Sequence, residues 1–137
     1  DAPVRFDAEM AERILDNVIT NSLEHTPPGG RIRIDAEVQP GRVSYAICNT
    51  GPPFSKKDLE HLFRKFYRGE EARGGKGGHA GLGLYIVRRL AERMGGSARA
   101  YNAESGEACV AFHHAVEPVR APSGENGAQA SVNAAKD

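Results

Sequence analysis

GGKGGHAGLGLYIVRRLAERM, from Gly74 to Met94, is the stretch around which the rest of this sequence is organised. Its first half holds five glycines in eight residues, from Gly74 to Gly81, and this much backbone freedom predicts a mobile loop. Its second half predicts a helix that ends at Gly95-Gly96, because apolar residues recur at helical spacing at Leu82, Ile86, Val87, Leu90 and Met94. A glycine-rich loop before a helix N-terminus presents free N–H groups and a positive dipole end, as phosphate-binding loops do. Alone, the pattern fits a plain flexible loop equally well.

Length and composition narrow the class of protein. The chain has 137 residues and a formal net charge of +0, which fits one domain and argues against a nucleic-acid or membrane-surface binder. Its two cysteines, Cys48 and Cys109, do not suggest a disulfide scaffold or a metal cluster, so we expect a reducing compartment. The sequence shows no signal peptide or membrane-spanning run. Because it begins without Met, we expect a fragment of a longer protein.

A long helix is expected from Ala8 to His25, with Asp7 as its N-cap. Asn17 and Asn21 lie one turn apart at the edge of its apolar face, although asparagine is a poor helix former. Either each amide bonds to a neighbouring loop, or the amide oxygens serve as hard ligands for Mg²⁺ and its waters.

The remaining elements predict a two-layer α/β sandwich. Alternating apolar residues over 31–38 and 43–48 indicate a β-hairpin, and 97–102 and 108–116 indicate a second one. Ser55 caps a short helix over 56–63. Because strands are grouped and helices must share a face, we expect a mixed, mostly antiparallel sheet with helices on one face. This domain should span residues 1–117, followed by a polar, flexible tail over 118–137.

Four segments together resemble the nucleotide-binding boxes of the catalytic domain of sensor histidine kinases. They are RILDNVITNSLEHTPPGG, NTGPPF, LFRKFYRG and GHAGLGLYIVRRLAERMGG. That domain has the Bergerat fold of the GHKL superfamily, which it shares with type II topoisomerases, Hsp90 chaperones and MutL proteins. The resemblance covers roughly Val4 to Val116 and implies a domain that binds ATP with Mg²⁺.

The resemblance also assigns roles to single residues. Asn21 matches the Mg²⁺-binding asparagine, and Asn17 matches the position where hydrolysing relatives carry a glutamate base. An amide cannot take a proton, so Asn17 points to phosphotransfer rather than hydrolysis. The other implied ATP-binding residues are His25, Asn49, Gly51, Phe63, Tyr67, Arg68, Lys76, Gly81, Leu82, Gly83 and Leu84.

Some positions depart from the family pattern. Asn49 stands where an aspartate usually accepts the adenine amino group, and Pro53 stands where a second glycine is usual. Glu24 replaces a common phosphate-facing cation, and His25 replaces a common aromatic residue. These changes bear on the affinity for ATP more than on the fold.

The function implied is that of a protein-histidine kinase. The γ-phosphate would pass to a histidine on an upstream dimerisation domain and then to a response regulator, in a membrane-associated homodimer whose catalytic part is cytoplasmic. None of the five histidines matches the acceptor motif. Two alternatives stay open: a degenerate, non-catalytic nucleotide-binding module, and an ATP hydrolase of the same superfamily, against which Asn17 argues.

Overall fold

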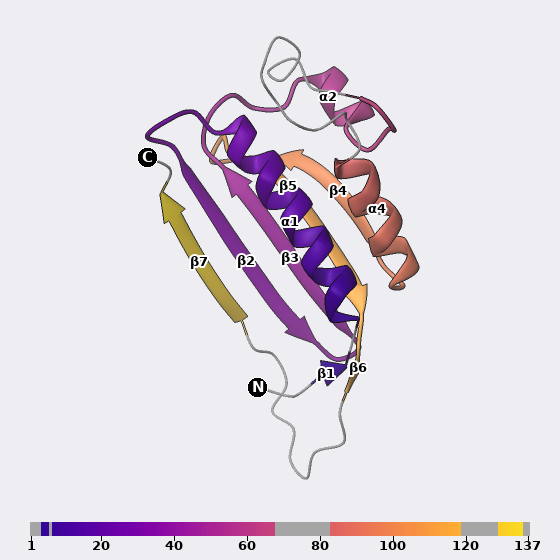
Figure 1. Cartoon of the computed structure of the whole chain (residues 1–137). Helices are drawn as coiled ribbons and strands as arrows, with labels where there is room; N and C mark the ends of the chain where they lie inside the picture. The colour runs from indigo at the N-terminus through magenta and orange to yellow at the C-terminus, as the bar shows by residue number, and fades with distance from the viewer. Residues whose placement is uncertain (1–3, 6, 68–82, 119–128, 136–137) are drawn as a thin grey trace.

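The computed structural model describes residues 4–5, 7–67, 83–118 and 129–135 of the chain. Its centre is a five-stranded sheet with the strand order β4-β5-β3-β2-β7 (Figure 1). Every strand pairing among the described residues is antiparallel. The strands span β2 Arg31–Gln39, β3 Arg42–Asn49, β4 Ser97–Asn102, β5 Ala108–Ala115 and β7 Gln129–Ala135.

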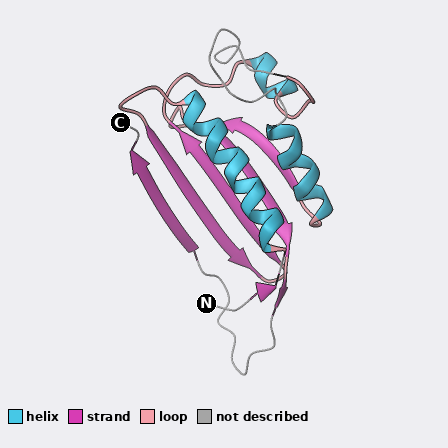
Figure 2. Ribbon diagram, viewed as in Figure 1, coloured by secondary structure: helices cyan, strands magenta, loops and turns pink. Residues whose placement is uncertain are grey.

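Two helices, α1 (Ala8–His25) and α4 (Gly83–Arg93), lie side by side over one face of this sheet (Figure 2). A short helix, α2 (Lys56–His61), lies beyond one end of the sheet. A small second sheet pairs β1 (Val4–Arg5) with β6 (Glu117–Pro118). The predicted two-layer α/β sandwich with helices on one face is confirmed.

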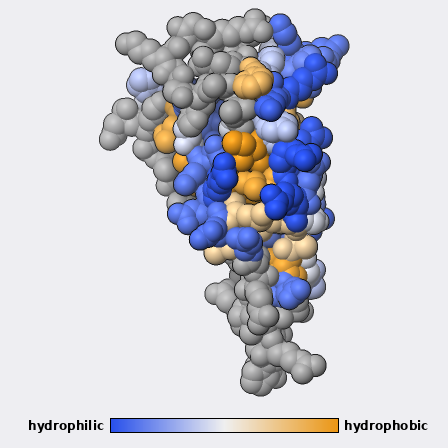
Figure 3. Space-filling view, turned by 45° about the vertical axis from the view of Figure 1, so that its right-hand side comes forward, coloured by the Kyte–Doolittle hydropathy of each residue, from blue (hydrophilic) through white to orange (hydrophobic). Residues whose placement is uncertain are grey.

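The core lies between the helices and the sheet. Ile14 and Val18 of α1, Val87 of α4 and Ile47 of β3 are completely buried there. Apolar burial of this kind contributes about 1.5 to 3 kcal/mol per large aliphatic side chain. On the side that carries α4, hydrophilic residues flank apolar ones that are exposed along the middle of the view (Figure 3).

Helix α1 begins where its sequence predicts. Asp7 is the N-cap, and its carboxylate accepts a hydrogen bond of 3.1 Å from the backbone N–H of Met10. Ser55 caps α2 in a full capping box with Asp58. Among the described helices, none is long and apolar enough to cross a bilayer.

The expected lack of structure in the tail is wrong for residues 129–135. These residues form β7, which pairs along β2 from Arg31↔Ala135 to Glu37↔Gln129. Its sequence alternates the small apolar residues Ala130, Val132 and Ala134 with the polar residues Ser131 and Asn133, a weak strand pattern that the open edge of β2 completes. Residues 119–128 lie outside the described residues.

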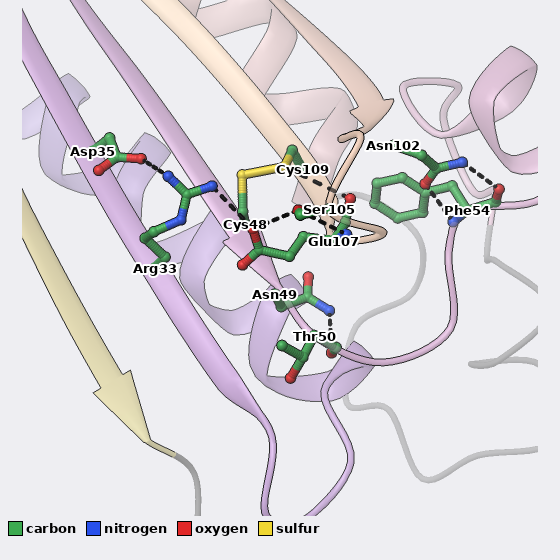
Figure 4. The surroundings of a disulfide bond; sticks show 10 residues. All are labelled: Arg33, Asp35, Cys48, Asn49, Thr50, Phe54, Asn102, Ser105, Glu107 and Cys109. Atoms are coloured by element: carbon green, nitrogen blue, oxygen red, sulfur yellow. Dashed lines mark hydrogen bonds and ion pairs between the residues drawn. A yellow bond between two sulfur atoms is a disulfide. The ribbon is translucent and has the colours of Figure 1, made fainter.

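The expectation that the cysteines form no disulfide is also wrong. Cys48 on β3 and Cys109 on β5 are register partners and are joined by a disulfide with a Cα–Cα distance of 4.1 Å (Figure 4). Both cysteines are buried, with Cys48 1% exposed and Cys109 0% exposed. The pairing depends on strand register, which the sequence did not reveal. Cysteine usage therefore gives no argument for a reducing compartment.

Candidate functional site

The C-terminal half of α1, the end of β3, α2 and the start of α4 come together at one end of the molecule (top of Figure 1). Asn17 lies on α1 directly against Gly83, the first residue of α4: a Cβ added to Gly83 would lie 3.5 Å from Asn17 Oδ1. The amide nitrogen of Asn17 donates to the carbonyl of Arg13 at 2.8 Å. The Asn17 oxygen therefore faces the N-terminal end of α4.

Asn21 follows one helical turn later and is half-buried beside the buried residues Val18 and Ser22. Among the described residues, no hydrogen bond is formed by its side-chain amide. The two asparagines thus share one edge of α1, as their spacing predicts. Neither amide bonds to a neighbouring loop among the described residues, which was the purely structural alternative for them.

Asn49 is the last residue of β3 and is only 2% exposed. Its amide nitrogen donates to the carbonyl of Thr50 at 3.0 Å (Figure 4). Alternation along β3 puts it on the same face as the core residue Ile47. Because the amide nitrogen is engaged, the Asn49 oxygen is the group that can accept a hydrogen bond from a ligand.

Gly51 follows with a φ of 122°, a conformation that side-chain-bearing residues rarely adopt. A Cβ at this position would lie 2.8 Å from Pro27 Cδ and 3.3 Å from the carbonyl oxygen of His25. Packing against the end of α1 thus requires glycine here, independently of any approach by a ligand.

His25 contacts the same loop from the other side. Its Nε2 donates to the carbonyl of Pro52 at 3.0 Å, and its ring packs against Phe54 with centroids 5.2 Å apart. These contacts hold the loop after β3 against the end of α1. A direct contact of His25 with ATP stays a prediction.

Asn102, which the sequence analysis did not single out, clamps this loop to β4. Its side-chain oxygen accepts from the backbone N–H of Phe54 at 2.8 Å, and its nitrogen donates to the Phe54 carbonyl at 3.0 Å. The reciprocal pair is drawn in Figure 4. The only sequence signal was an asparagine at the end of a predicted strand, which is too common to identify such a clamp.

The predicted aromatic residues lie next to α2. The hydroxyl of Tyr67 donates to Asp58 Oδ1 at 2.6 Å, and Asp58 is only 3% exposed. Phe63 packs against the core, with the Arg88 guanidinium 5.4 Å from its ring centre. Asp58, a second residue that sequence reasoning missed, therefore ties the helix cap to Tyr67.

The remaining predicted residues divide into two groups. Gly83 and Leu84 begin α4, and Leu84 is a core residue at 5% exposure. Outside the described residues lie Arg68, Lys76, Gly81 and Leu82, together with the glycine-rich loop. Glu24 is exposed near the end of α1.

A family profile described as "Histidine kinase-, DNA gyrase B-, and HSP90-like ATPase" matches residues 6–118. Among curated proteins, the chain is 32% identical over 114 residues to the sensor histidine kinase WalK of Bacillus subtilis, covering 82% of this chain and 19% of that protein. It is 37% identical over 108 residues to the sensor histidine kinase component HK1 of Mycobacterium tuberculosis, covering 79% and 62%. The chain thus spans about a fifth of the length of WalK.

Solved structures agree with this assignment. A mycobacterial sensor histidine kinase, MprB, superposes with a TM-score of 0.72 at 26% identity and covers 86% of this chain and 81% of its own. Full-length ShkA in complex with AMPPNP gives a TM-score of 0.71 at 27% identity, covering 89% and 25%. The chain therefore belongs to the histidine kinase-, DNA gyrase B- and HSP90-like ATPase family, as an ATP-binding catalytic domain of the sensor histidine kinase type.

Proposed function

We propose that this domain binds ATP with Mg²⁺ and, in the intact protein, donates the γ-phosphate to a histidine on an upstream dimerisation domain, for relay to a response regulator. The observation that carries the proposal is that Asn17 Oδ1 faces Gly83 at the N-terminus of α4. A helix N-terminus favours phosphate, and it lies here beside an amide rather than a carboxylate. Among the relatives, ShkA has been solved with AMPPNP.

The adenine end of the site is formed by Asn49 and the loop after it. The Asn49 oxygen would accept a hydrogen bond from the adenine amino group, while its nitrogen stays on the carbonyl of Thr50. Gly51 packs against Pro27, and because it has no side chain, the backbone of this loop stays open to the nucleotide. The clamp by Asn102 then fixes the loop relative to the sheet.

The residues present fit a magnesium ion. Asn21 offers a half-buried amide oxygen, and Mg²⁺ takes oxygen ligands, keeping several waters and using substrate phosphates for much of its coordination. The described residues contain no cluster of three or more His, Cys, Asp or Glu side chains that could hold the ion alone. When bound, the ion would neutralise phosphate charge, and Asn21 would orient the triphosphate toward α4.

Asn17 favours transfer over hydrolysis. Its nitrogen is committed to the carbonyl of Arg13, and its oxygen cannot take a proton from water at neutral pH. The site therefore lacks a general base at this position. The site would instead position the nucleotide and stabilise the charge of the transferring phosphoryl group, and these two effects account for most of the catalysis of phosphoryl transfer.

The proposed partners are those of the intact, longer protein. The relatives WalK and HK1 are sensor histidine kinases, which supports an upstream dimerisation domain and a response regulator as partners of the intact chain. We also infer a membrane-associated homodimer with this domain in the cytoplasm. No role in nucleic-acid binding is proposed, given the net charge of +0.

The first test is calorimetric titration of Asn21→Ala with Mg-ATP. Asn21 lies at the edge of the core, so the variant should fold. It should lose the Mg²⁺-dependent part of the ATP affinity, which is measured in the wild type as the affinity lost when EDTA is added. Asp16→Ala, an exposed change on the same helix, is the control and should bind as the wild type does. Unchanged, Mg²⁺-dependent affinity in folded Asn21→Ala would remove Asn21 from the site.

The second test uses γ-labelled ATP with this chain alone and with a separate dimerisation segment. Alone, the chain should release little free phosphate and carry no acid-labile label. Label should appear on the added segment. Rapid phosphate release would favour the hydrolase, and absence of ATP binding would favour the non-catalytic module.

A further inference from the structure

The face of the sheet that no described helix covers is hollowed over β3, β5 and β4, near the end where β3 and β4 begin. Register places Ser44, His113 and Ser97 in one row across β3, β5 and β4. Ala111 and Ala46 occupy the next row, beside Arg99. Small side chains in these rows leave a hollow of about 180 Å³, lined by Arg42, Ser44, Ser97, Arg99, Ala111 and His113 together with Tyr45 and Phe112.

The cations around this hollow are already oriented. Arg42 donates from Nε to Ser44 Oγ at 3.3 Å, which holds the guanidinium along the strand. The guanidinium carbon of Arg99 lies 4.5 Å from the ring centre of Tyr101. Stacking uses the flat face of a guanidinium and leaves N–H donors at its edge. Neither arginine forms an ion pair with a described residue.

No carboxylate lines this hollow. The nearest acids on the same face, Asp35 and Glu37, line an adjoining hollow that shares Arg99 with this one, and Glu37 is the register partner of Ser44. Asp35 is paired with Arg33, and Glu37 accepts from Gln39 at 2.6 Å. The charge of the face is therefore divided, with the positive part over β3, β5 and β4.

His113 lies at the centre of the positive part. Burial lowers the pKa of its imidazole, and the charges of Arg42 and His114 lower it further. Burial is the larger cause, and the smaller effect of Arg42 shows that this arginine lies close enough to act on a group bound beside His113.

We propose that this hollow binds a phosphate-type oxyanion, on the face of the sheet opposite the helices. Arg42 and Arg99 would supply charged N–H donors, and Ser44, Ser97 and His113 would supply neutral ones. Arginine forks and serine hydroxyls together match the several acceptor oxygens of a phosphate group. The proposal does not depend on ATP binding, which involves the other face.

The test follows the His113 ring by NMR in this chain, with the signal assigned by its loss in His113→Gln. Inorganic phosphate is titrated against sodium chloride at matched ionic strength. We expect a saturable shift of the His113 signal and a rise in its pKa. Arg42→Gln and Arg99→Gln should each weaken the apparent affinity by about tenfold, because each removes a charge-assisted hydrogen bond.

Arg93→Gln, an exposed change on α4 away from the hollow, is the matched control and should leave the titration unchanged. A shift that fails to saturate would overturn the proposal. The same conclusion would follow if the shift were equal in chloride, or if neither hollow arginine affected it. Because Arg42 and Arg99 are both exposed, the variants should remain folded, which thermal unfolding checks.

Discussion

Asn17 and Gly83 face each other across the seam between α1 and α4, with Asn17 Oδ1 3.5 Å from where a Cβ of residue 83 would be. This distance is an ordinary van der Waals contact, so a methyl group would fit without moving the helices. It would, however, fill the space between the Asn17 amide and the first turn of α4. The fold therefore tolerates a methyl group at position 83, whereas the proposed approach of a phosphate to α4 requires glycine there.

Gly83→Ala should therefore separate stability from binding. Alanine in place of glycine stabilises a helix interior by about 0.5 to 1 kcal/mol and gains less at a first residue such as Gly83, so the unfolding temperature should be unchanged or slightly higher. ATP affinity should fall by about tenfold or more, because the methyl group obstructs the approach of phosphate to the N-terminus of α4. Thermal unfolding and calorimetric titration measure the two effects. Full ATP affinity would show that the triphosphate does not pass Gly83.

Asn49→Asp tests the adenine end. The aspartate would lose the donor that bonds the Thr50 carbonyl, and it would bury a charge at a position only 2% exposed. The free energy of unfolding without ATP should therefore fall by about 1 to 3 kcal/mol. If the side chain accepts from the adenine amino group, the charged acceptor should bind ATP more tightly, by about 1 kcal/mol. The rise in unfolding temperature caused by ATP should then be larger; a smaller rise would assign Asn49 another contact.

Gly51→Ala should destabilise the domain more than the same change at Gly106. Both glycines have positive φ, at 122° and 94°, but only Gly51 would bring a Cβ to 2.8 Å from Pro27. Gly106→Ala should cost about 1 kcal/mol from backbone strain alone. The Gly51 variant should cost about 2 kcal/mol or more, since the end of α1 must also move. Urea unfolding of both variants gives the difference; equal losses would mean that the loop adjusts around Pro27.

Local signals account for the parts of the fold that the sequence predicted well. Asp7 and Ser55 are caps whose hydrogen bonds involve residues three positions away, so their roles can be read along the chain. The helical spacing of Asn17 and Asn21 likewise placed both on one edge of α1.

The features that were missed depend on contacts between distant segments. The disulfide requires Cys48 and Cys109 to be register partners, and register is set by the whole sheet. The Asn102 clamp requires the end of β4 to lie beside Phe54, 48 positions away in the sequence. Strand β7 owes its place to the edge of β2. The disulfide and the Asn102 clamp have no local pattern, and the alternation of small residues in β7 is too weak to identify a strand without its partner.

His113 predicts a pH dependence of stability. Burial and the charges of Arg42 and His114 lower its pKa in the folded state, so the unfolded chain binds more protons near its ordinary pKa of about 6.5. Protonation of His113 therefore does not reduce the free energy of unfolding above about pH 7, and it reduces it as the pH falls through about 6.5. Urea unfolding at several pH values should show that the free energy of unfolding falls less steeply with decreasing pH in His113→Gln than in the wild type. An equal slope in both would mean that other groups determine the acid sensitivity.

Reduction of the disulfide should lower the stability of the domain without abolishing its fold. The bond links residues 61 positions apart, and closing a loop of this length restricts the unfolded chain by an amount typically worth about 2 to 4 kcal/mol. Because both cysteines are buried, the reductant should be added to the unfolded chain, which is then refolded with the reductant present. Urea unfolding with and without dithiothreitol measures the loss, and the double variant Cys48→Ala/Cys109→Ala should not respond to reductant. A wild-type midpoint that is the same with and without reductant would show that the bond does not contribute to stability in solution.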